Sequence, residues 1–209
     1  MSDPAFEPTL KERSEFGRGS LAANLVRSTM KIGGYELGDT RIYSRLTGRL
    51  RKAIATDTKH EKGKRILASA DLSPLVGFQW NKHKAFDKLY KGEPTFSIDA
   101  KTGLMEIDLP GIKGADDFDA PKSASHVQFV LEGGAFDFQM EEGTAVSDTT
   151  KWLYLKRKHP VQTMHGTVAM KKGMRMVLGI GIRFGQEVND GIYPLAHKQF
   201  KGFVVGMVV

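Results

Sequence analysis

The sequence predicts an α+β chain in which an N-terminal arm and helices precede an antiparallel, jelly-roll-like β-sandwich. Apolar residues recur with a helical period up to about residue 70 and with a period of two beyond it. The later apolar runs are short and are separated by turn residues, with no useful helix between them. With 209 residues, 40% of them hydrophobic, the chain is long enough to bury a real core. We therefore expect an arm and helical segment over residues 1–70 and an antiparallel β-sandwich domain over residues 71–209.

The N-terminal region is expected to begin as an arm and then turn helical. Residues 1–19 contain two prolines and two glycines and show no apolar period, which indicates an extended arm or loop. Ser20 is a suitable N-cap for a helix over residues 21–32, which the pair Gly33-Gly34 would end. The apolar stripe of this helix would consist of Leu21, Leu25 and Met30.

A second helix is predicted by a regular apolar spacing. Asp39 or Thr40 can cap its start, and Ala53 lies on the same face as the apolar residues. The residues that recur every four positions are Ile42, Leu46, Leu50 and Ile54.

About nine strands are expected after residue 70. Residues 74–80 read as a buried strand, and residues 96–98 and 105–107 flank a short hairpin loop. Residues 126–131 and 136–140 are predicted to form a hairpin that turns at Gly133-Gly134. The remaining strands are expected at residues 152–157, 161–170, 174–184 and 203–209, the third with apolar residues at every even position from Met174 to Phe184.

Glycines in the strand at residues 174–184 resemble a dinucleotide-binding fingerprint only loosely. Gly179, Gly181 and Gly185 have one residue too many in the last interval, and the segment reads as a strand throughout. We expect these glycines to let large neighbours pack closely against the backbone.

Charge is divided into blocks of opposite sign. Residues 41–91 carry 13 basic and 4 acidic residues, whereas residues 92–150 carry 3 basic and 12 acidic ones. The formal net charge of the whole chain is +7. The basic block can therefore meet the acidic block of the same chain or of another copy, or it can meet nucleic acid.

The basic block supplies the candidate binding residues. Four of them follow the helical spacing on a face separate from the apolar one, and three more come from the connection after that helix. We expect these seven to form a protein interface or a polyanion-binding surface: Arg41, Arg45, Arg49, Lys52, Lys62, Lys64 and Arg65. Aromatic residues among lysines at residues 80–90 suit base stacking, but anchoring of a strand end is the favoured interpretation.

The acidic block supplies the candidate partner surface. Its carboxylates are densest at two places, and neither has the glycine and terminal glutamate of an EF-hand, so no metal site is expected. The acidic partner surface is predicted to comprise Asp116, Asp117, Asp119, Glu141 and Glu142.

Several function classes are excluded or disfavoured. The chain has no cysteine, which excludes thiolate metal sites, iron–sulfur clusters and disulfides. No phosphate loop, nucleophile elbow or His pair at metal-binding spacing is present, so we expect no cofactor and no catalytic activity. The N-terminus lacks a signal peptide pattern and no apolar run is long enough to span a membrane, so an intracellular protein is expected.

Two groups of short motifs resemble one family. Residues 178–209 are similar to the C-terminal half of an uncharacterised bacterial family of about this length. Glu15-Phe16-Gly17 with Ser20, then Arg45-Leu46 and Gly63-Lys64-Arg65, resemble its N-terminal half. The resemblance implies a helical N-terminal part and a β-rich C-terminal part, with no known activity and no functional residues.

Together these observations favour a non-catalytic structural protein. We expect self-assembly into a homo-oligomer, filament or shell through charge-block and β-strand contacts, with other copies of the chain as partners. The alternative is a nucleic-acid-binding protein that uses the basic segment 41–91. A ligand- or carbohydrate-binding sandwich is the third interpretation.

Overall fold

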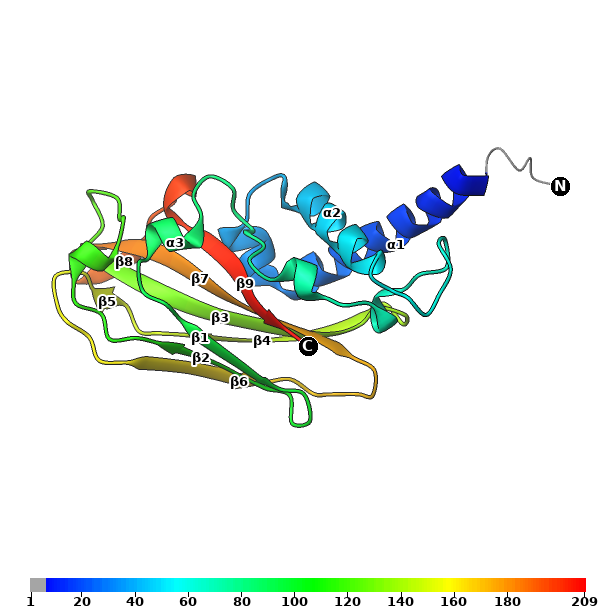
Figure 1. Cartoon of the computed structure of the whole chain (residues 1–209). Coiled ribbons are helices and arrows are strands. Elements are labelled where there is room, and N and C mark those ends of the chain that lie inside the picture. The colour runs from blue at the N-terminus through cyan, green and yellow to red at the C-terminus, as the bar shows by residue number, and fades with distance from the viewer. Residues whose placement is uncertain (1–6) are drawn as a thin grey trace.

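The chain folds into three layers (Figure 1). The computed structural model describes residues 7–209, with side chains described from residue 11 on. A helical layer covers one face of a six-stranded antiparallel sheet, and a three-stranded antiparallel sheet covers the other face. The predicted α+β class, with helices mainly in the N-terminal part and a sandwich-like β region after them, is confirmed.

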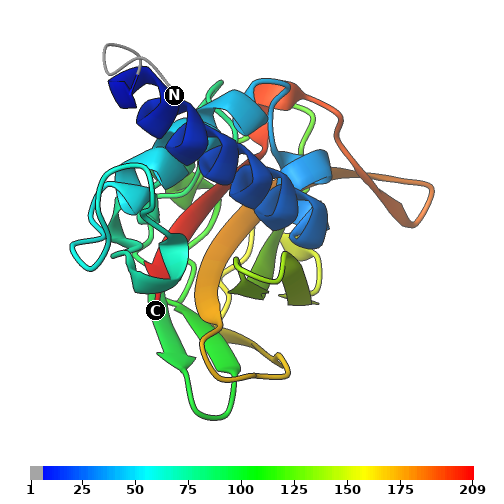
Figure 2. The same ribbon diagram turned by 90° about the vertical axis from the view of Figure 1, so that its right-hand side faces the viewer.

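The helical layer is formed by α1 (Glu7–Thr29), a π-helical segment (Ile32–Leu37) and α2 (Ile42–Ile54). Figure 2 shows α1 lying across the sheet layer. The prediction of an arm over residues 1–19 is wrong from residue 7 on, where α1 begins. Residues 1–6 lie outside the described residues. Ser20 is inside α1 and does not cap it. Gly19 also lies inside α1. The absence of a side chain there lets α2 pack closely, since an added Cβ would lie 2.8 Å from Arg51 Cγ.

The buried faces of the two helices differ in how well they were predicted. On α2 the five apolar residues that were expected to be buried are all buried. Of the predicted stripe, Met30, just after α1, is buried and Leu25 is partly buried, whereas Leu21 is 53% exposed. Among the described side chains of α1, the apolar ones that are fully buried are Ala22, Ala23 and Val26. Asp39 accepts a hydrogen bond from the Arg41 N–H at the start of α2, although the capping residue itself is Arg41.

Gly33 and Gly34 do not end a helix, contrary to expectation. Both lie in the π-helical segment, where an added Cβ on Gly34 would be 2.5 Å from the Arg27 carbonyl oxygen. The carboxylate of Glu132, on the sheet below, accepts hydrogen bonds from the Ile32 N–H (2.9 Å) and the Gly33 N–H (2.7 Å). This contact satisfies main-chain donors at the start of the segment.

The six-stranded sheet has β3 and β7 at its centre. Strand β7 (Arg175–Val188) pairs with β3 (His126–Asp137) along most of its length. The other neighbours are β4 (Glu142–Thr149) and β5 (Leu153–Tyr154) beside β3, and β8 (Gly191–Pro194) and β9 (Gly202–Val208) beside β7. The three-stranded sheet has the order β1 (Thr95–Asp99), β2 (Leu104–Leu109) and β6 (Gln162–Thr167).

The hairpin predicted to turn at Gly133-Gly134 is wrong, because β3 runs straight through both glycines. An added Cβ on Gly133 would lie 1.9 Å from Met105 Sδ, so the glycine is needed for packing. The chain reverses instead over residues 138–141, where Glu141 has φ +56°. The first hairpin, β1 with β2, is confirmed.

Residues 74–80 do not form the expected strand. A 3₁₀ turn occupies Ser73–Leu75, and residues 77–80 then lie along the outer edge of β9 (Gly202–Val208). The Gly77 N–H donates to the Val205 carbonyl (2.8 Å), and the Trp80 N–H donates to the Phe203 carbonyl (2.8 Å). This segment therefore joins the helical layer to the sheet.

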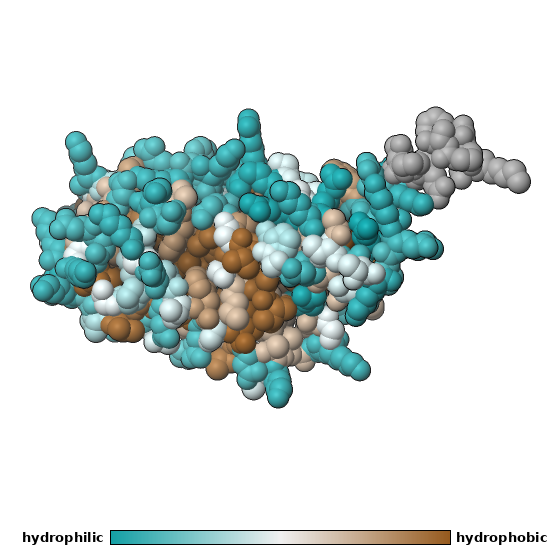
Figure 3. All heavy atoms as spheres, in the orientation of Figure 1, coloured by the Kyte–Doolittle hydropathy of each residue, from teal (hydrophilic) through white to brown (hydrophobic). Residues whose placement is uncertain are grey.

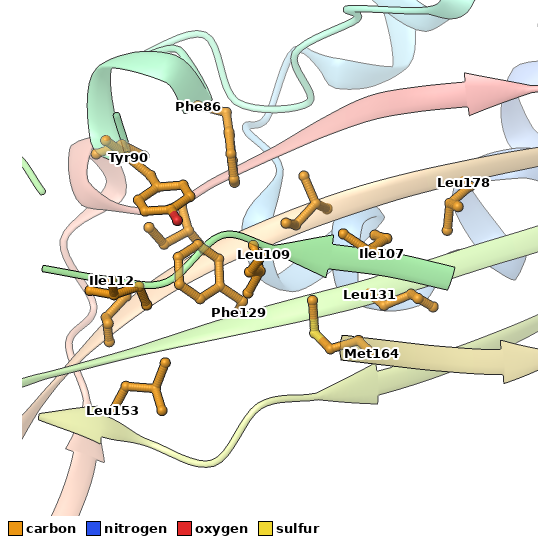
Figure 4. Packing of buried hydrophobic residues seen from close by; sticks show 14 of the residues in the cluster. Phe86, Tyr90, Ile107, Leu109, Ile112, Phe129, Leu131, Leu153, Met164 and Leu178 are labelled. Carbon is orange, nitrogen blue, oxygen red and sulfur yellow. The ribbon is translucent and has the colours of Figure 1, made fainter. Parts of the chain in front are cut away.

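Alternate residues of β3 and β7 serve two cores. Figure 4 shows the core between the sheets, where Phe129 packs against Tyr90 with ring centroids 4.8 Å apart. The short helix α3 (Phe86–Leu89) closes this core at one end. The second core lies between the helices and the sheet, around Trp80 and Phe203. In β7, Gly181 leaves room for Leu37, which confirms the close-packing role predicted for it.

Candidate functional site

The most strongly charged concave surface lies beside α2. Three hollows lie in a row there. The middle one shares Arg45 and Lys82 with one neighbour and Asp39 and His83 with the other. We call this continuous surface the basic trough. Its basic lining residues are Arg41, Arg45, Arg49, Lys52, Lys82, His83, Lys198 and Lys201.

Arg45 is held in place from three directions. Its guanidinium donates to the Asp39 carboxylate (2.7 Å), to the Gln79 carbonyl (2.6 Å) and to the Trp80 carbonyl (3.0 Å). It also lies over the Phe78 ring, 5.3 Å from the centroid. A fixed guanidinium loses little conformational entropy when a ligand binds, so this side chain is preorganised.

Asp39 is the one carboxylate among the lining residues of the trough in the described part of the chain. Its side chain is 8% exposed. Besides Arg45 it accepts hydrogen bonds from the Arg41 N–H (2.8 Å) and the Lys82 N–H (2.8 Å). Asp39 therefore neutralises Arg45 and fixes the main chain at two points, and the other cations of the trough have no carboxylate beside them among its described lining residues.

Most of the remaining cations are not neutralised by the chain. Within residues 11–209, the side chains of Arg41, Arg49, Lys52 and Lys82 make no ion pair. Arg49 donates a hydrogen bond of 3.4 Å to the Pro74 carbonyl. The trough therefore presents several positive charges that can pair with an external anion.

The far end of the trough is held together by the buried side-chain amide of Asn81. Asn81 donates to the Lys198 carbonyl (2.8 Å) and to the Lys201 carbonyl (2.9 Å), and accepts from the His83 N–H (2.9 Å). Lys201 in turn donates to the Glu36 carbonyl. These bonds bring the residues before β9 beside the loop that follows Trp80. Tyr35, 55% exposed, lines the same end.

The floor of the trough beside α2 has little side-chain bulk. Gly48 and Gly77 line it together with Phe78, and the hollow there has a volume of about 400 Å³. A Cβ added at Gly48 would meet no atom within 4 Å. An anion can therefore approach the helix surface between Arg45, Arg49 and Lys52 without a steric barrier.

The structure brings only part of the predicted basic set together. The four candidates on α2 line the trough, whereas Lys62, Lys64 and Arg65 lie in the loop after α2 and are not among its lining residues. Lys62 pairs with Glu12 of α1 (3.0 Å), and Lys64 lies 3.8 Å from Glu61. The loop residues are thus partly neutralised by their own chain.

The aromatic residues of the segment 80–90 anchor the fold, as the favoured interpretation had it. Trp80, Phe86 and Tyr90 are buried, whereas His83 is exposed in the trough. Burial, together with the charge of Asp117, raises the pKa of Tyr90 to about 12. These rings are therefore unavailable for stacking on a ligand.

Two of the five residues of the predicted acidic surface, Asp119 and Glu142, pair with lysines of the same chain. Lys84 pairs with Asp119, and the Lys113 N–H donates to the Asp117 carboxylate (2.6 Å). At the other acidic site, Glu142 pairs with Lys171 (2.9 Å). Asp116 and Glu141 are exposed. No group of three His, Asp or Glu residues in the described chain is arranged to hold a metal ion.

The sequence did not identify Lys198 or Lys201 as residues of the trough, nor Asp39 as the counter-ion of Arg45. Nothing in the local pattern marks the two lysines, because Asn81 reaches them across 117 and 120 residues of chain.

None of the described helices combines the length and apolarity that a membrane-spanning helix requires. Comparison with known proteins finds no matching family model, no matching curated protein and no matching solved structure. The resemblance to an uncharacterised bacterial family stays a prediction.

Proposed function

We propose that the chain is a non-catalytic nucleic-acid-binding protein and that the basic trough receives the phosphate backbone. The observation that carries the proposal is the row of three hollows with shared lining residues, which together have seven Lys or Arg residues and one carboxylate that is paired with Arg45. Phosphate contacts of this kind supply most of the affinity in sequence-independent nucleic-acid binding. Tyr35, at one end of the trough, is 55% exposed; the Arg27 guanidinium lies over its ring, 4.3 Å from the centroid, so a base would have to stack on the opposite face.

Nucleic acid fits this surface better than the acidic block of another copy does. Asp119 and Glu142 already have cationic partners within their own chain. An acidic surface that is partly neutralised offers less attraction to a second basic surface, and exposed ion pairs are weak, about 0–1 kcal/mol each. A nucleic-acid backbone carries a phosphate charge at every nucleotide, and the release of its condensed counterions favours binding to a basic surface.

Gly48 allows a test that removes no native contact. In Gly48→Glu a carboxylate enters the trough between Arg45, Arg49 and Lys52, whereas in Gly48→Gln an uncharged side chain of the same size does so. Both replacements favour the helix relative to glycine, so the melting temperature should stay the same or rise.

The measurement is fluorescence anisotropy with labelled single-stranded DNA, single-stranded RNA and duplex DNA at several salt concentrations. We expect Gly48→Glu to weaken binding by at least about tenfold, which is the effect of losing one to two phosphate contacts, and Gly48→Gln to weaken it far less. The slope of log affinity against log salt should be several units in the native protein and smaller in Gly48→Glu. Equal affinity of the two variants, or a salt-independent affinity, contradicts the proposal.

Self-assembly is a second candidate, favoured by a different surface. Figure 3 shows apolar side chains gathered on the face where β9 and β1 run close together. Phe96 and Ile98 of β1 and Val204 and Met207 of β9 are only partly buried. Val76 beside them is 46% exposed. Residues 77–80 cover one half of the outer edge of β9, and a strand of another copy is proposed to pair with the other half.

The mass of the particle in solution tests this second candidate. Light scattering over a range of protein concentrations should show an oligomer that Val76→Lys dissociates, and Val188→Lys serves as the control at another exposed valine. If Arg45→Glu with Arg49→Glu dissociates the oligomer and Asp116→Lys with Asp117→Lys restores it, charge blocks hold the copies together. A monomer at all concentrations removes the candidate.

A further inference from the structure

A second hollow lies beneath α1, on a part of the molecule that the basic trough does not include. Its lining comes from three places: one face of α1, the turn around Leu67, and the reversal between β3 and β4. The volume is about 290 Å³, room for about ten non-hydrogen atoms at ~30 Å³ each. The lining residues that matter here are Arg18, Leu21, Leu25, Ala68, Phe138 and Glu141.

The walls of this hollow are apolar and are held open by the fold. Leu21 is 53% exposed although its neighbours Ala22 and Ala23 on α1 are buried. Phe138 is stacked on Phe136 with ring centroids 5.6 Å apart, so its ring cannot swing in to fill the space. Arg175 of β7 donates to the Ala70 carbonyl (2.8 Å) and holds the opposite wall. Filling the space with an apolar chain would remove these surfaces from water.

Arg18 places a positive charge at this hollow. One of its terminal nitrogens donates to the Gly63 carbonyl. Its Nε is buried and has no hydrogen-bond partner within the described residues, and the guanidinium makes no ion pair there. A partly desolvated guanidinium without a counter-ion favours a carboxylate as its partner, because a hydrogen bond between two charged groups is stronger than one between neutral groups.

We propose that the hollow binds an unbranched aliphatic monocarboxylate of about eight carbons in all, the carboxylate on Arg18 and the tail against Leu21, Leu25 and Phe138. Glu141 lies at the rim, exposed and without a cationic partner in residues 11–209. Its charge opposes an anionic ligand, so the carboxylate binds at the Arg18 side. This site is separate from the basic trough and does not depend on the function proposed for it.

The test is isothermal titration calorimetry with octanoate, and with octanol and octylammonium as ligands with the same number of carbons. Octanoate should bind at least about tenfold more tightly than octanol, because a hydrogen bond to a charged partner outweighs a neutral one. Arg18→Gln should remove that difference, while Arg13→Gln, the same change at an exposed site on the same helix, should preserve it. Glu141→Gln should tighten octanoate binding.

Ala68→Leu provides a second variant in case Arg18→Gln loses the contact with Gly63 and fails to fold. The added atoms enter the hollow from the wall opposite α1, so octanoate binding should fall by at least about tenfold with the melting temperature preserved. Gly48→Glu should leave octanoate binding unchanged. Undiminished binding to Ala68→Leu, equal binding of octanol and octanoate, or tighter binding of octylammonium that Glu141→Gln abolishes, each overturns the proposal.

Discussion

Asp57 and Glu132 are buried carboxylates that accept main-chain hydrogen bonds, yet their pKa values are shifted in opposite directions. Burial opposes the ionisation of Asp57, but donors from Ile66, His60 and Lys59 outweigh it and hold its pKa well below the usual range. At Glu132 burial prevails over the donors Gly33 and Ile32, so its pKa is raised. The two residues should therefore change stability in opposite ways with pH.

We expect Asp57→Asn to lower the stability of the protein at neutral pH. A lowered folded-state pKa contributes stability that is present above the unfolded value of 3.8 and is lost as the pH falls through the folded value. The deficit of the variant should therefore shrink below about pH 4. Urea unfolding at pH 7, 4 and 3 measures it, and a deficit that does not change with pH would contradict this assignment.

For Glu132→Gln the pH dependence is expected to have the opposite sign. A raised folded-state pKa contributes stability that is present below the unfolded value of 4.5 and is lost as the pH rises through the folded value. Relative to the native protein, the variant should gain stability as the pH rises from 4.5 toward neutrality. The variant also loses one of two accepted hydrogen bonds, which shifts its stability at every pH, so the slope in parallel urea titrations is the quantity to compare.

At the scale of elements, apolar periodicity correctly predicted α2 and β7, whereas several glycines were wrongly interpreted as turn or loop residues. In α2 and β7 the side chains that point into a core recur with the period of the helix or of the strand. The spacing of apolar residues was therefore sufficient to predict both elements. Gly19 and Gly133 were interpreted as loop or turn residues, but each lies inside an element where a neighbour leaves no room for a Cβ. A glycine selected for a tertiary contact cannot be told from one selected for a turn until the neighbour is known.

The same distinction applies to the candidate sites. Four residues of the trough follow a helical spacing on α2 and were predicted. The lysines at its far end, and the hollow at Arg18, depend on contacts between segments far apart in the chain, which a single sequence does not encode locally.

Gly17→Ala tests whether α1 is continuous through the region that was expected to be an arm. A Cβ at Gly17 would meet no atom within 4 Å, so the replacement carries no steric cost. In a helix interior alanine is more favourable than glycine by about 0.5–1 kcal/mol, which raises the melting temperature of a chain this size by roughly 1–4 °C. Differential scanning calorimetry measures the shift; no gain, together with unchanged helical circular dichroism, would indicate that this part of α1 is not helical in solution.

The whole molecule is joined through the second core. Phe136, Val177, Phe203 and Val205 belong to strands, yet they pack in one cluster with residues of α1 and α2. Because the helices cover one face of the sheet, separating the layers would expose large apolar surfaces on both. The helical segment and the sandwich should therefore share their stability.

We accordingly expect thermal unfolding to be a single transition. Trp80 is buried between the helices and β9, whereas Trp152 precedes β5 on the far part of the sheet. In Trp152→Phe the fluorescence reports on Trp80 alone, and in Trp80→Phe it reports on Trp152 alone. Within each variant, the fluorescence midpoint should agree with the midpoint measured by far-ultraviolet circular dichroism. Midpoints that differ would show two independently folding parts.

The junction at Asn81 also bears on how the chain reaches this fold. One end of the basic trough exists only when the loop after Trp80 has met residues 198–201, more than a hundred positions later. Contacts of such long sequence separation carry a large loop-closure entropy and tend to slow folding. We therefore expect this end of the trough to form late in folding, and a ligand that requires the whole trough would bind only the completed fold and, by mass action, stabilise it.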